Sequence, residues 1–146
     1  MTKVYLAGPF FDDEQIARLE RVEAALQANP TVESFYSPFR DSFDDYEFGS
    51  KAWAKVVFES DRQHLHDADV VVGIVDYDQD YVDPGTAWEL GYAGMQGKKV
   101  VIFKEKEGGI NIMISVPAHT FIRQADQLAT YDFNVMPASE WDGPVF

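Results

Sequence analysis

The sequence contains no cysteine. Disulfide bonds, thiolate nucleophiles and cysteine metal sites are therefore excluded. Basic residues are also scarce, because 12 lysines and arginines stand against 25 aspartates and glutamates, which gives a net charge of −13. Affinity for nucleic acid rests largely on lysine and arginine neutralising phosphates, so this charge argues against DNA, RNA and anionic membranes as partners. A small or neutral ligand fits the composition better.

Long apolar segments are missing as well. No stretch approaches the roughly 20 apolar residues of a membrane-spanning helix, and the first residues run directly into a predicted strand without an apolar signal region. We therefore expect a cytoplasmic protein without membrane partners. The length of 146 residues predicts a single domain, residues 1–146, that is large enough for a real apolar core.

Two common kinds of cofactor site are also absent. The first predicted strand ends in Ala7-Gly8-Pro9-Phe10-Phe11, which has neither the glycine pattern of a dinucleotide-binding turn nor a phosphate loop ending in lysine and serine or threonine. Of the three histidines, His64 and His66 point to different faces of one predicted helix and His119 is remote in sequence. We therefore expect no cofactor and no metal.

What the sequence does contain is a regular alternation of strands and helices. The predicted strands are Lys3–Ala7, Val32–Tyr36, Val70–Val75, Lys99–Phe103 and Thr120–Arg123, and the predicted helices are Asp12–Ala28, Ser50–His66, Gly85–Gln96 and a short one near Asn111–Pro117. A loop rich in aspartate and phenylalanine covers residues 37–49. The alternation predicts an α/β fold, a three-layer sandwich around a doubly wound parallel sheet with strand order 2-1-3-4-5.

Carboxylates gather after the third predicted strand, whose apolar, β-branched residues indicate burial on both faces. They are Asp76, Asp78, Asp80, Asp83 and Glu89. In such sheets ligands bind where strands end and helices begin. The sequence therefore predicts a functional site at this edge of the sheet.

Each of the two most informative carboxylates also has a plain structural interpretation. Asp83 precedes Pro84 and matches a helix N-cap followed by proline at the first helical position. Glu89 could be an ordinary exposed helix residue. Three glycines at positions 85, 91 and 94 favour a site instead, because they cost helix stability and suggest close approach by a ligand or by neighbouring backbone.

Several short motifs, in their order and spacing, resemble the nucleoside 2-deoxyribosyltransferases. They are Tyr5 and Phe11, Asp61, Asp83, Glu89-Leu90-Gly91-Tyr92-Ala93, Asn111-Ile112-Met113 and the final Gly143-Pro144-Val145-Phe146. The resemblance spans nearly the whole chain. It implies a flavodoxin-like fold and an enzyme of nucleoside salvage that moves 2-deoxyribose between the purine or pyrimidine bases of deoxynucleosides, with free nucleobases as acceptors.

The resemblance implies a retaining double displacement with Glu89 as the nucleophile. Asp83 or Asp61 would handle the base and its proton, while Tyr5, Phe10 and Phe11 would position Glu89 and the substrate. Cleaving an N-glycosidic bond builds cationic character on the sugar carbon, which a carboxylate can trap covalently. We therefore expect Glu89 to stay ionised, aided by the helix dipole and by hydrogen bonds to its oxygens. One aspartate should have a raised pKa, so that it can act as acid and base.

The resemblance also implies a homo-oligomer built from dimers, up to a hexamer, in which Asn111 and Met113 complete the site of a neighbouring subunit. Asn111 could equally cap a short helix. Phe146 stands where better-known members end in tyrosine, so one hydroxyl at the site is missing. Arg40 lies in a segment where some members carry a glutamine for base recognition, and it could contact a base or pair with the acidic loop.

Two other functions fit parts of the same pattern. A related N-glycosidase would hydrolyse 2′-deoxynucleoside 5′-monophosphates with the same glutamate, although those hydrolases have a serine where Asn111 stands. A non-enzymatic phospho-receiver domain would share the strand order. Asp12, Asp13, Asp76 and Lys104 mimic its acids and lysine. Helix capping explains the first pair, and a receiver would leave Glu89 and Asn111 without a role.

Overall fold

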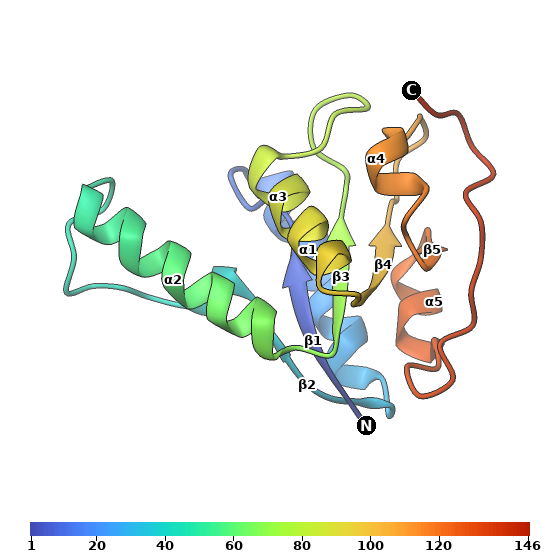
Figure 1. Ribbon diagram of the computed structural model, residues 1–146, viewed down its shortest axis with the longest axis horizontal. Helices are drawn as coiled ribbons and strands as arrows, with labels where there is room; N and C mark the ends of the chain where they lie inside the picture. The colour runs from blue at the N-terminus through green and yellow to red at the C-terminus, as the bar shows by residue number, and fades with distance from the viewer.

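The computed structural model describes all of residues 1–146 (Figure 1). Its elements are β1 (Thr2–Ala7), α1 (Asp13–Ala28), β2 (Val32–Tyr36), α2 (Lys51–Asp67), β3 (Val70–Ile74), α3 (Pro84–Met95), β4 (Lys99–Phe103), α4 (Ile112–Ser115), β5 (Thr120–Ile122) and α5 (Ala125–Thr130). A 3₁₀ turn, Pro38–Arg40, follows β2. All the predicted strands and helices are present, whereas α5 is an additional helix that the sequence pattern did not indicate.

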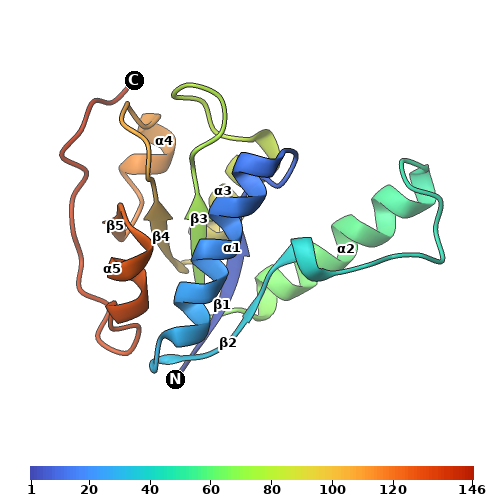
Figure 2. The ribbon, with the colours of Figure 1, turned by 180° about the vertical axis from the view of Figure 1, so that it is seen from behind.

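The five strands form one parallel sheet in the order β2-β1-β3-β4-β5, which confirms the predicted topology. Helices α1 and α5 cover one face, and α3 and α4 lie over the other (Figures 1 and 2). Each face carries its own apolar cluster. The central strand β3 is buried along its whole length, as its run of β-branched residues predicted.

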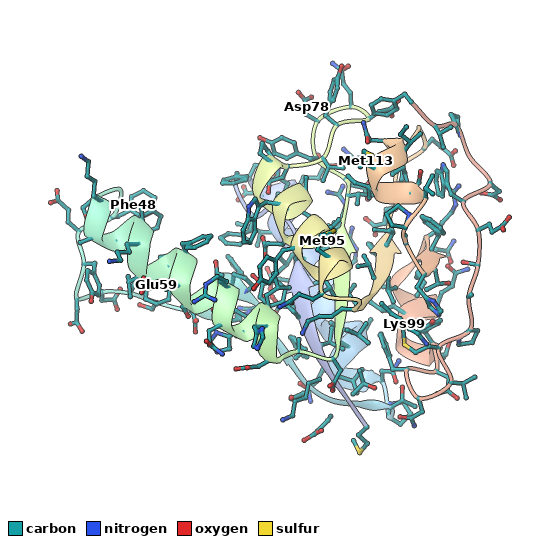
Figure 3. The ribbon with its side chains drawn as sticks, in the orientation of Figure 1. Phe48, Glu59, Asp78, Met95, Lys99 and Met113 are labelled. Atoms are coloured by element: carbon teal, nitrogen blue, oxygen red, sulfur yellow. The ribbon has the colours of Figure 1, made fainter.

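Helix α2 only partly covers the sheet. Its carboxyl-terminal half packs near α3, while its amino-terminal half extends past the β2 edge, away from the rest of the molecule (Figure 2). Leu65 is its only buried residue. Phe48, just before the helix, lies at the far tip (Figure 3) and is 83% exposed. Residues of α2, of the loop after β2 and of the start of α3 line the space along this helix.

Close packing of α3 against β3 fixes the other side of that space. A Cβ atom on Gly73 would come within 2.5 Å of a methyl carbon of Leu90, so Leu90 packs directly over the glycine and would have to shift if position 73 carried a side chain. The residue next to Leu90 on α3 is Glu89, which is thereby held at the sheet. No helix in the structure combines the length and the apolar character needed to cross a bilayer.

Candidate active site

The amino terminus of α3 is capped by Asp83, as the Asp-Pro pattern predicted. One carboxylate oxygen, Oδ2, accepts hydrogen bonds from the backbone N–H and from the hydroxyl of Thr86, both at 2.9 Å. Asp83 is 9% exposed, and Pro84 occupies the first turn. This cap orders the first turn of α3 and thereby the direction in which the second turn presents its side chains.

Glu89 lies in that second turn and faces a cleft of about 340 Å³. The cleft is lined by Phe58, Asp61, Arg62, Leu65, Gly85, Trp88 and Glu89. Tyr5 on β1 is fully buried beside Glu89. The Tyr5 hydroxyl and Oε2 of Glu89 are both buried and have no hydrogen-bond partner. Buried polar atoms are rarely left in this state, so the pair is a candidate for contact with a ligand.

The carboxyl group of Glu89 has a pKa raised to about 8, mainly because burial penalises its charge. The charges of Asp61 and Asp83 raise this pKa further. The Tyr5 hydroxyl lies close enough to lower it in part, but its geometry falls short of a hydrogen bond. Burial thus opposes the expected ionised state of Glu89, and the expected hydrogen bond to Oε2 is not present. The helix dipole acts mainly within the first turn, and at Glu89 desolvation outweighs it.

Asp61 reaches the same cleft from α2. Its Oδ1 lies 3.0 Å from the hydroxyl oxygen of Tyr36, which ends β2. Burial raises the pKa of Asp61 and the charge of Asp41 adds to the rise, while the Tyr36 hydroxyl and His64 oppose it. A raised pKa is what a carboxyl group needs in order to act as an acid and a base near neutral pH.

A second, aromatic pocket of about 440 Å³ adjoins this cleft, and Asp61 lines both. The side chains around it include Phe10, Phe39, Phe43, Tyr46, Phe48 and Trp53, together with Asp41 and Asp44. Phe10 is thus placed beside Asp61, as a substrate-positioning role requires. Phe11 is 72% exposed and meets Tyr77 edge-on, with ring centroids 6.2 Å apart.

Arg40 and Phe146 lie outside the Glu89 cleft. The Arg40 guanidinium pairs with Glu23 of α1 at 2.8 Å, so its partner is a helix carboxylate and not the acidic loop. Phe146 meets Tyr81 edge-on at 6.1 Å, and its carbonyl accepts a hydrogen bond from the Ile112 N–H at 2.9 Å. The end of the chain is therefore attached to the start of α4.

Asn111 and Met113 do not line the cleft of their own chain. Oδ1 of Asn111 accepts a hydrogen bond from the Met113 N–H at 2.9 Å, which is the capping arrangement. Met113 is 78% exposed and borders a largely apolar groove between α3 and α4, as does Met95 (Figure 3). A Cβ atom on Gly91 or Gly94, which line this groove, would meet nothing within 4 Å. Within the chain, no backbone approaches these two glycines.

Asp76 is the clearest correction to the sequence-based site. Its side chain is fully buried on the α1 side of the sheet. It accepts hydrogen bonds from the backbone N–H groups of Glu105 at 2.7 Å and Lys106 at 3.1 Å, and it pairs with Lys104 at 3.5 Å and Arg18 at 3.7 Å. Asp76 is therefore fully engaged inside the protein and does not join the Glu89 cleft.

The remaining acids of the predicted cluster are dispersed. Asp78 and Asp80 are exposed on the loop before α3, where Figure 3 places Asp78 at the tip. Asp12 caps α1 by accepting a hydrogen bond from the Gln15 N–H at 2.8 Å. Of the acids that mimic a phospho-receiver, Asp12 is thus a helix cap and Asp76 is held in buried ion pairs, so Asp76 offers no exposed carboxylate for phosphorylation.

Sequence reasoning missed two members of the site, Tyr36 and Arg62. Arg62 follows Asp61 directly and is the one basic side chain lining the Glu89 cleft. Tyr36 lies at the end of a predicted strand in a parallel sheet, so the rule that ligands bind at such ends could have identified it.

Comparison with known proteins assigns the family. Residues 4–133 match the family described as Nucleoside 2-deoxyribosyltransferase. A nucleoside deoxyribosyltransferase of Limosilactobacillus fermentum is 32% identical over 91% of this chain and 86% of its own length, and one from Lactobacillus johnsonii is 31% identical over 97% and 100%. The solved 2-deoxyribosyltransferase of Bacillus psychrosaccharolyticus superimposes with a TM-score of 0.86 at 35% identity, covering 95% of this chain and 98% of that one. With a match over most of its length, the chain belongs to the nucleoside 2-deoxyribosyltransferase family of enzymes.

Proposed function

We propose that the protein transfers 2-deoxyribose from one nucleobase to another through a covalent intermediate on Glu89. The observation that carries this proposal is the unpartnered pair of Glu89 Oε2 and the Tyr5 hydroxyl, buried in a cleft beside Asp61. A buried carboxylate without compensation is costly, and a cationic sugar in the transition state would supply that compensation. Deoxynucleosides and free bases are the substrates that this reaction uses.

The first half of the reaction transfers the sugar to the protein. An ionised oxygen of Glu89 forms a bond to the sugar C1′ while the bond from C1′ to the base nitrogen breaks, and its electron pair goes to the base. An aspartate, Asp61 or Asp83, supplies the proton that neutralises the departing base. Burial opposes ionisation of Glu89, and the positive charge that develops on the sugar in the transition state would favour the ionised form.

The second half reverses these steps with a new base. The incoming base nitrogen gives its proton to the aspartate and bonds to C1′, and the bond to Glu89 breaks. Two inversions give net retention at C1′. Phe10 and the aromatic pocket next to Asp61 offer apolar faces on which a flat base can pack.

The test is an exchange assay with thymidine and free adenine, followed by chromatography of deoxyadenosine. Wild-type protein should form deoxyadenosine, and Glu89→Ala should lose at least about a thousandfold of this rate because the nucleophile is gone. A circular dichroism spectrum of the variant provides the folding control. Full transfer activity in a folded Glu89→Ala protein would refute the proposed nucleophile.

The position of Arg62 favours a second candidate, hydrolysis of 2′-deoxynucleoside 5′-monophosphates. Arg62 is the basic residue of the Glu89 cleft and forms no ion pair within the chain, so its guanidinium could bind a 5′-phosphate. Identity near 30% to the curated transferases allows such a related hydrolase. Base release from deoxynucleoside monophosphates, without transfer from thymidine to adenine, would favour this candidate.

We further propose that the protein is a homo-oligomer whose subunits complete each other's sites through Asn111 and Met113. The support is the exposure of Met113 and Met95, which line the groove between α3 and α4 and are 78% and 89% exposed. Exposed apolar surface of this kind is typical of protein interfaces. Met113→Glu should shift the mass measured by light scattering toward the monomer and reduce transfer, whereas a dimer of unchanged mass and activity would refute this assembly.

A further inference from the structure

The hydroxyl of Tyr36 lies between two carboxylates. It is 3.0 Å from Oδ1 of Asp61 on α2, and it also forms a hydrogen bond with Oδ2 of Asp41, which lies on the loop after β2. The ring is held in place by stacking on His64, with centroids 3.6 Å apart and planes 4° from parallel, and by Tyr5 at 5.6 Å. The oxygen of Tyr36 is therefore fixed in position, and only its hydrogen is free to turn.

One hydrogen cannot serve two ionised carboxylates. Burial raises the pKa of Tyr36, as do the hydrogen bond to Asp41 and the charge of Asp61, with partial opposition from Ser60, so the hydroxyl keeps its proton. If both aspartates were ionised, one contact would set an oxygen lone pair against a negative carboxylate. Both contacts become favourable when one of the two carboxyl groups is protonated and donates to Tyr36.

Of the two carboxyl groups, Asp61 is the better site for this proton. Asp41 is exposed, so water can stabilise its charge, whereas Asp61 is half-buried and its pKa is raised by burial and by the charge of Asp41. Asp83, the other candidate acid, accepts two hydrogen bonds at the start of α3. Both bonds are accepted by Oδ2, and hydrogen bonds of this kind favour the charged form of a carboxyl group.

On the basis of the proposed transferase function, we propose that Tyr36 is a positioning residue whose hydroxyl switches between Asp41 and Asp61, making Asp61 the acid and base of the reaction. The hydroxyl donates to Asp41 while Asp61 is protonated, and it turns to donate to Asp61 once that proton has left. The switch requires two hydrogens to turn, the carboxyl proton of Asp61 from Tyr36 toward the base and the hydroxyl hydrogen of Tyr36 from Asp41 toward Asp61, and no movement of the backbone.

The proton balance of the transfer follows from this arrangement. As the C1′ to nitrogen bond breaks, its electron pair goes to the base nitrogen, which takes the proton of Asp61 while Glu89 bonds to C1′. The new Asp61 carboxylate then accepts the Tyr36 hydrogen bond, and water replaces that bond at the exposed Asp41. The incoming base reverses each step. Charged and titratable groups around Asp61 are Tyr36, Asp41, Asp44, Arg62, His64, Tyr5 and Glu89.

The first test removes the hydroxyl and compares two donors that differ by one fluorine. Tyr36→Phe keeps the stacked ring but cannot stabilise the Asp61 carboxylate. We expect kcat/KM for 2′-deoxyuridine to fall about 10- to 100-fold, the effect of losing a hydrogen bond to a charged group. The value for 5-fluoro-2′-deoxyuridine should fall much less, because fluorine stabilises the departing base and reduces its need for a proton. Tyr131→Phe, which loses a hydrogen bond to Pro137 far from the cleft, is the control and should leave the ratio of the two donors unchanged.

The second test keeps Tyr36 and changes its exposed partner. In Asp41→Asn the amide can donate to the Tyr36 oxygen, which turns the hydroxyl toward Asp61 and fixes Asp61 as a carboxylate. We expect the same loss with 2′-deoxyuridine, and a lower pKa of Asp61 in ¹³C NMR titrations of carboxyl-labelled aspartate, with the signal assigned by Asp61→Asn. Asp45→Asn removes the same charge from an exposed position of the same loop and should change neither property.

The outcomes separate the switch from the underlying activity. Equal losses with both donors in Tyr36→Phe, or an unchanged titration of Asp61 in Asp41→Asn, would overturn the switch while leaving the transferase intact. If Tyr36→Phe does not fold, the Asp41→Asn measurements decide alone. Wild-type protein that releases neither uracil nor 5-fluorouracil would instead refute the proposed function.

Discussion

Asp76 and Glu89 are two acids on the segments that follow the same central strand, and their surroundings are opposite. Asp76, on the α1 side, is satisfied by two backbone N–H groups and two basic side chains. Glu89, on the α3 side, has a buried oxygen without any partner and faces other acids. The chain has few basic residues, yet it places two of them at Asp76 and leaves Glu89 uncompensated.

The difference indicates which carboxyl group stabilises the fold and which one is left to interact with a substrate. A buried charge is tolerated when it is paired and hydrogen-bonded. The Asp76 contacts join β3, α1 and the loop after β4, and thereby hold the carboxyl end of the sheet together. Glu89 lacks this compensation, so a bound substrate has interactions to supply. Asp76 thus stabilises the fold on one face of the sheet, and we propose that Glu89 reacts with substrate on the other.

The largest effect on stability should come from removing Asp76. Asp76→Ala leaves Arg18 and Lys104 buried without their carboxylate, which should cost about 3–5 kcal/mol of unfolding free energy. Urea denaturation measures this loss. Asp78→Ala, which removes an exposed carboxylate two residues away, is the control and should change stability little. Equal losses of unfolding free energy in the two variants would show that the buried contacts of Asp76 do not stabilise the fold, and its contrast with Glu89 would disappear.

Removing the titrating group of Glu89 should stabilise the protein, in contrast to removing Asp76, and the size of this gain should depend on pH. Its pKa is raised from 4.5 to about 8 in the folded protein, so its contribution to stability is complete below pH 4.5 and is lost as pH rises toward 8. Glu89→Gln carries no titrating group and avoids this loss. The variant should therefore gain at least about 1 kcal/mol relative to wild type between these pH values. Parallel stability curves for the two proteins would show that Glu89 is compensated in solution.

The smallest effect on stability should come from an exposed ion pair near Asp76. Arg21 pairs with Glu105 at 2.7 Å, but its side chain is half exposed. Arg21→Ala should therefore cost only about 0.5 kcal/mol in denaturation, and less at high salt. Arg18→Ala, whose side chain is buried beside the same glutamate, is the matched comparison and should cost several times more. Similar losses of stability in the two variants would mean that charge alone, and not burial, determines how much each ion pair contributes.

The sequence was sufficient for the order of the strands in the sheet. Its apolar segments predicted β1 to β5, and the Asp83-Pro84 pair correctly marked the start of α3. Helix α5 was not predicted, because it has only six residues and its N-cap, Gln124, makes no side-chain hydrogen bond. Short helices of this kind depend on packing more than on local sequence signals.

The electrostatic state of the site could not be predicted from the sequence, because it depends on contacts between distant segments. The sequence placed Asp76 in the predicted site, because its ion pairs with Arg18 and Lys104 form only in the folded protein. The raised pKa of Glu89 arises from burial, and from Asp61 on another helix. Local rules on helix dipoles gave the wrong direction for Glu89, since they do not include desolvation.

The most direct test of Glu89 as the nucleophile is intact-protein mass spectrometry after incubation with a deoxynucleoside in the absence of any acceptor base, followed by peptide mapping. We expect an increase by the mass of one deoxyribosyl group, located on the peptide that contains Glu89 and absent in Glu89→Gln. Transfer activity without any such adduct, or an adduct on a different residue, would contradict the assignment of the uncompensated carboxyl group as the nucleophile.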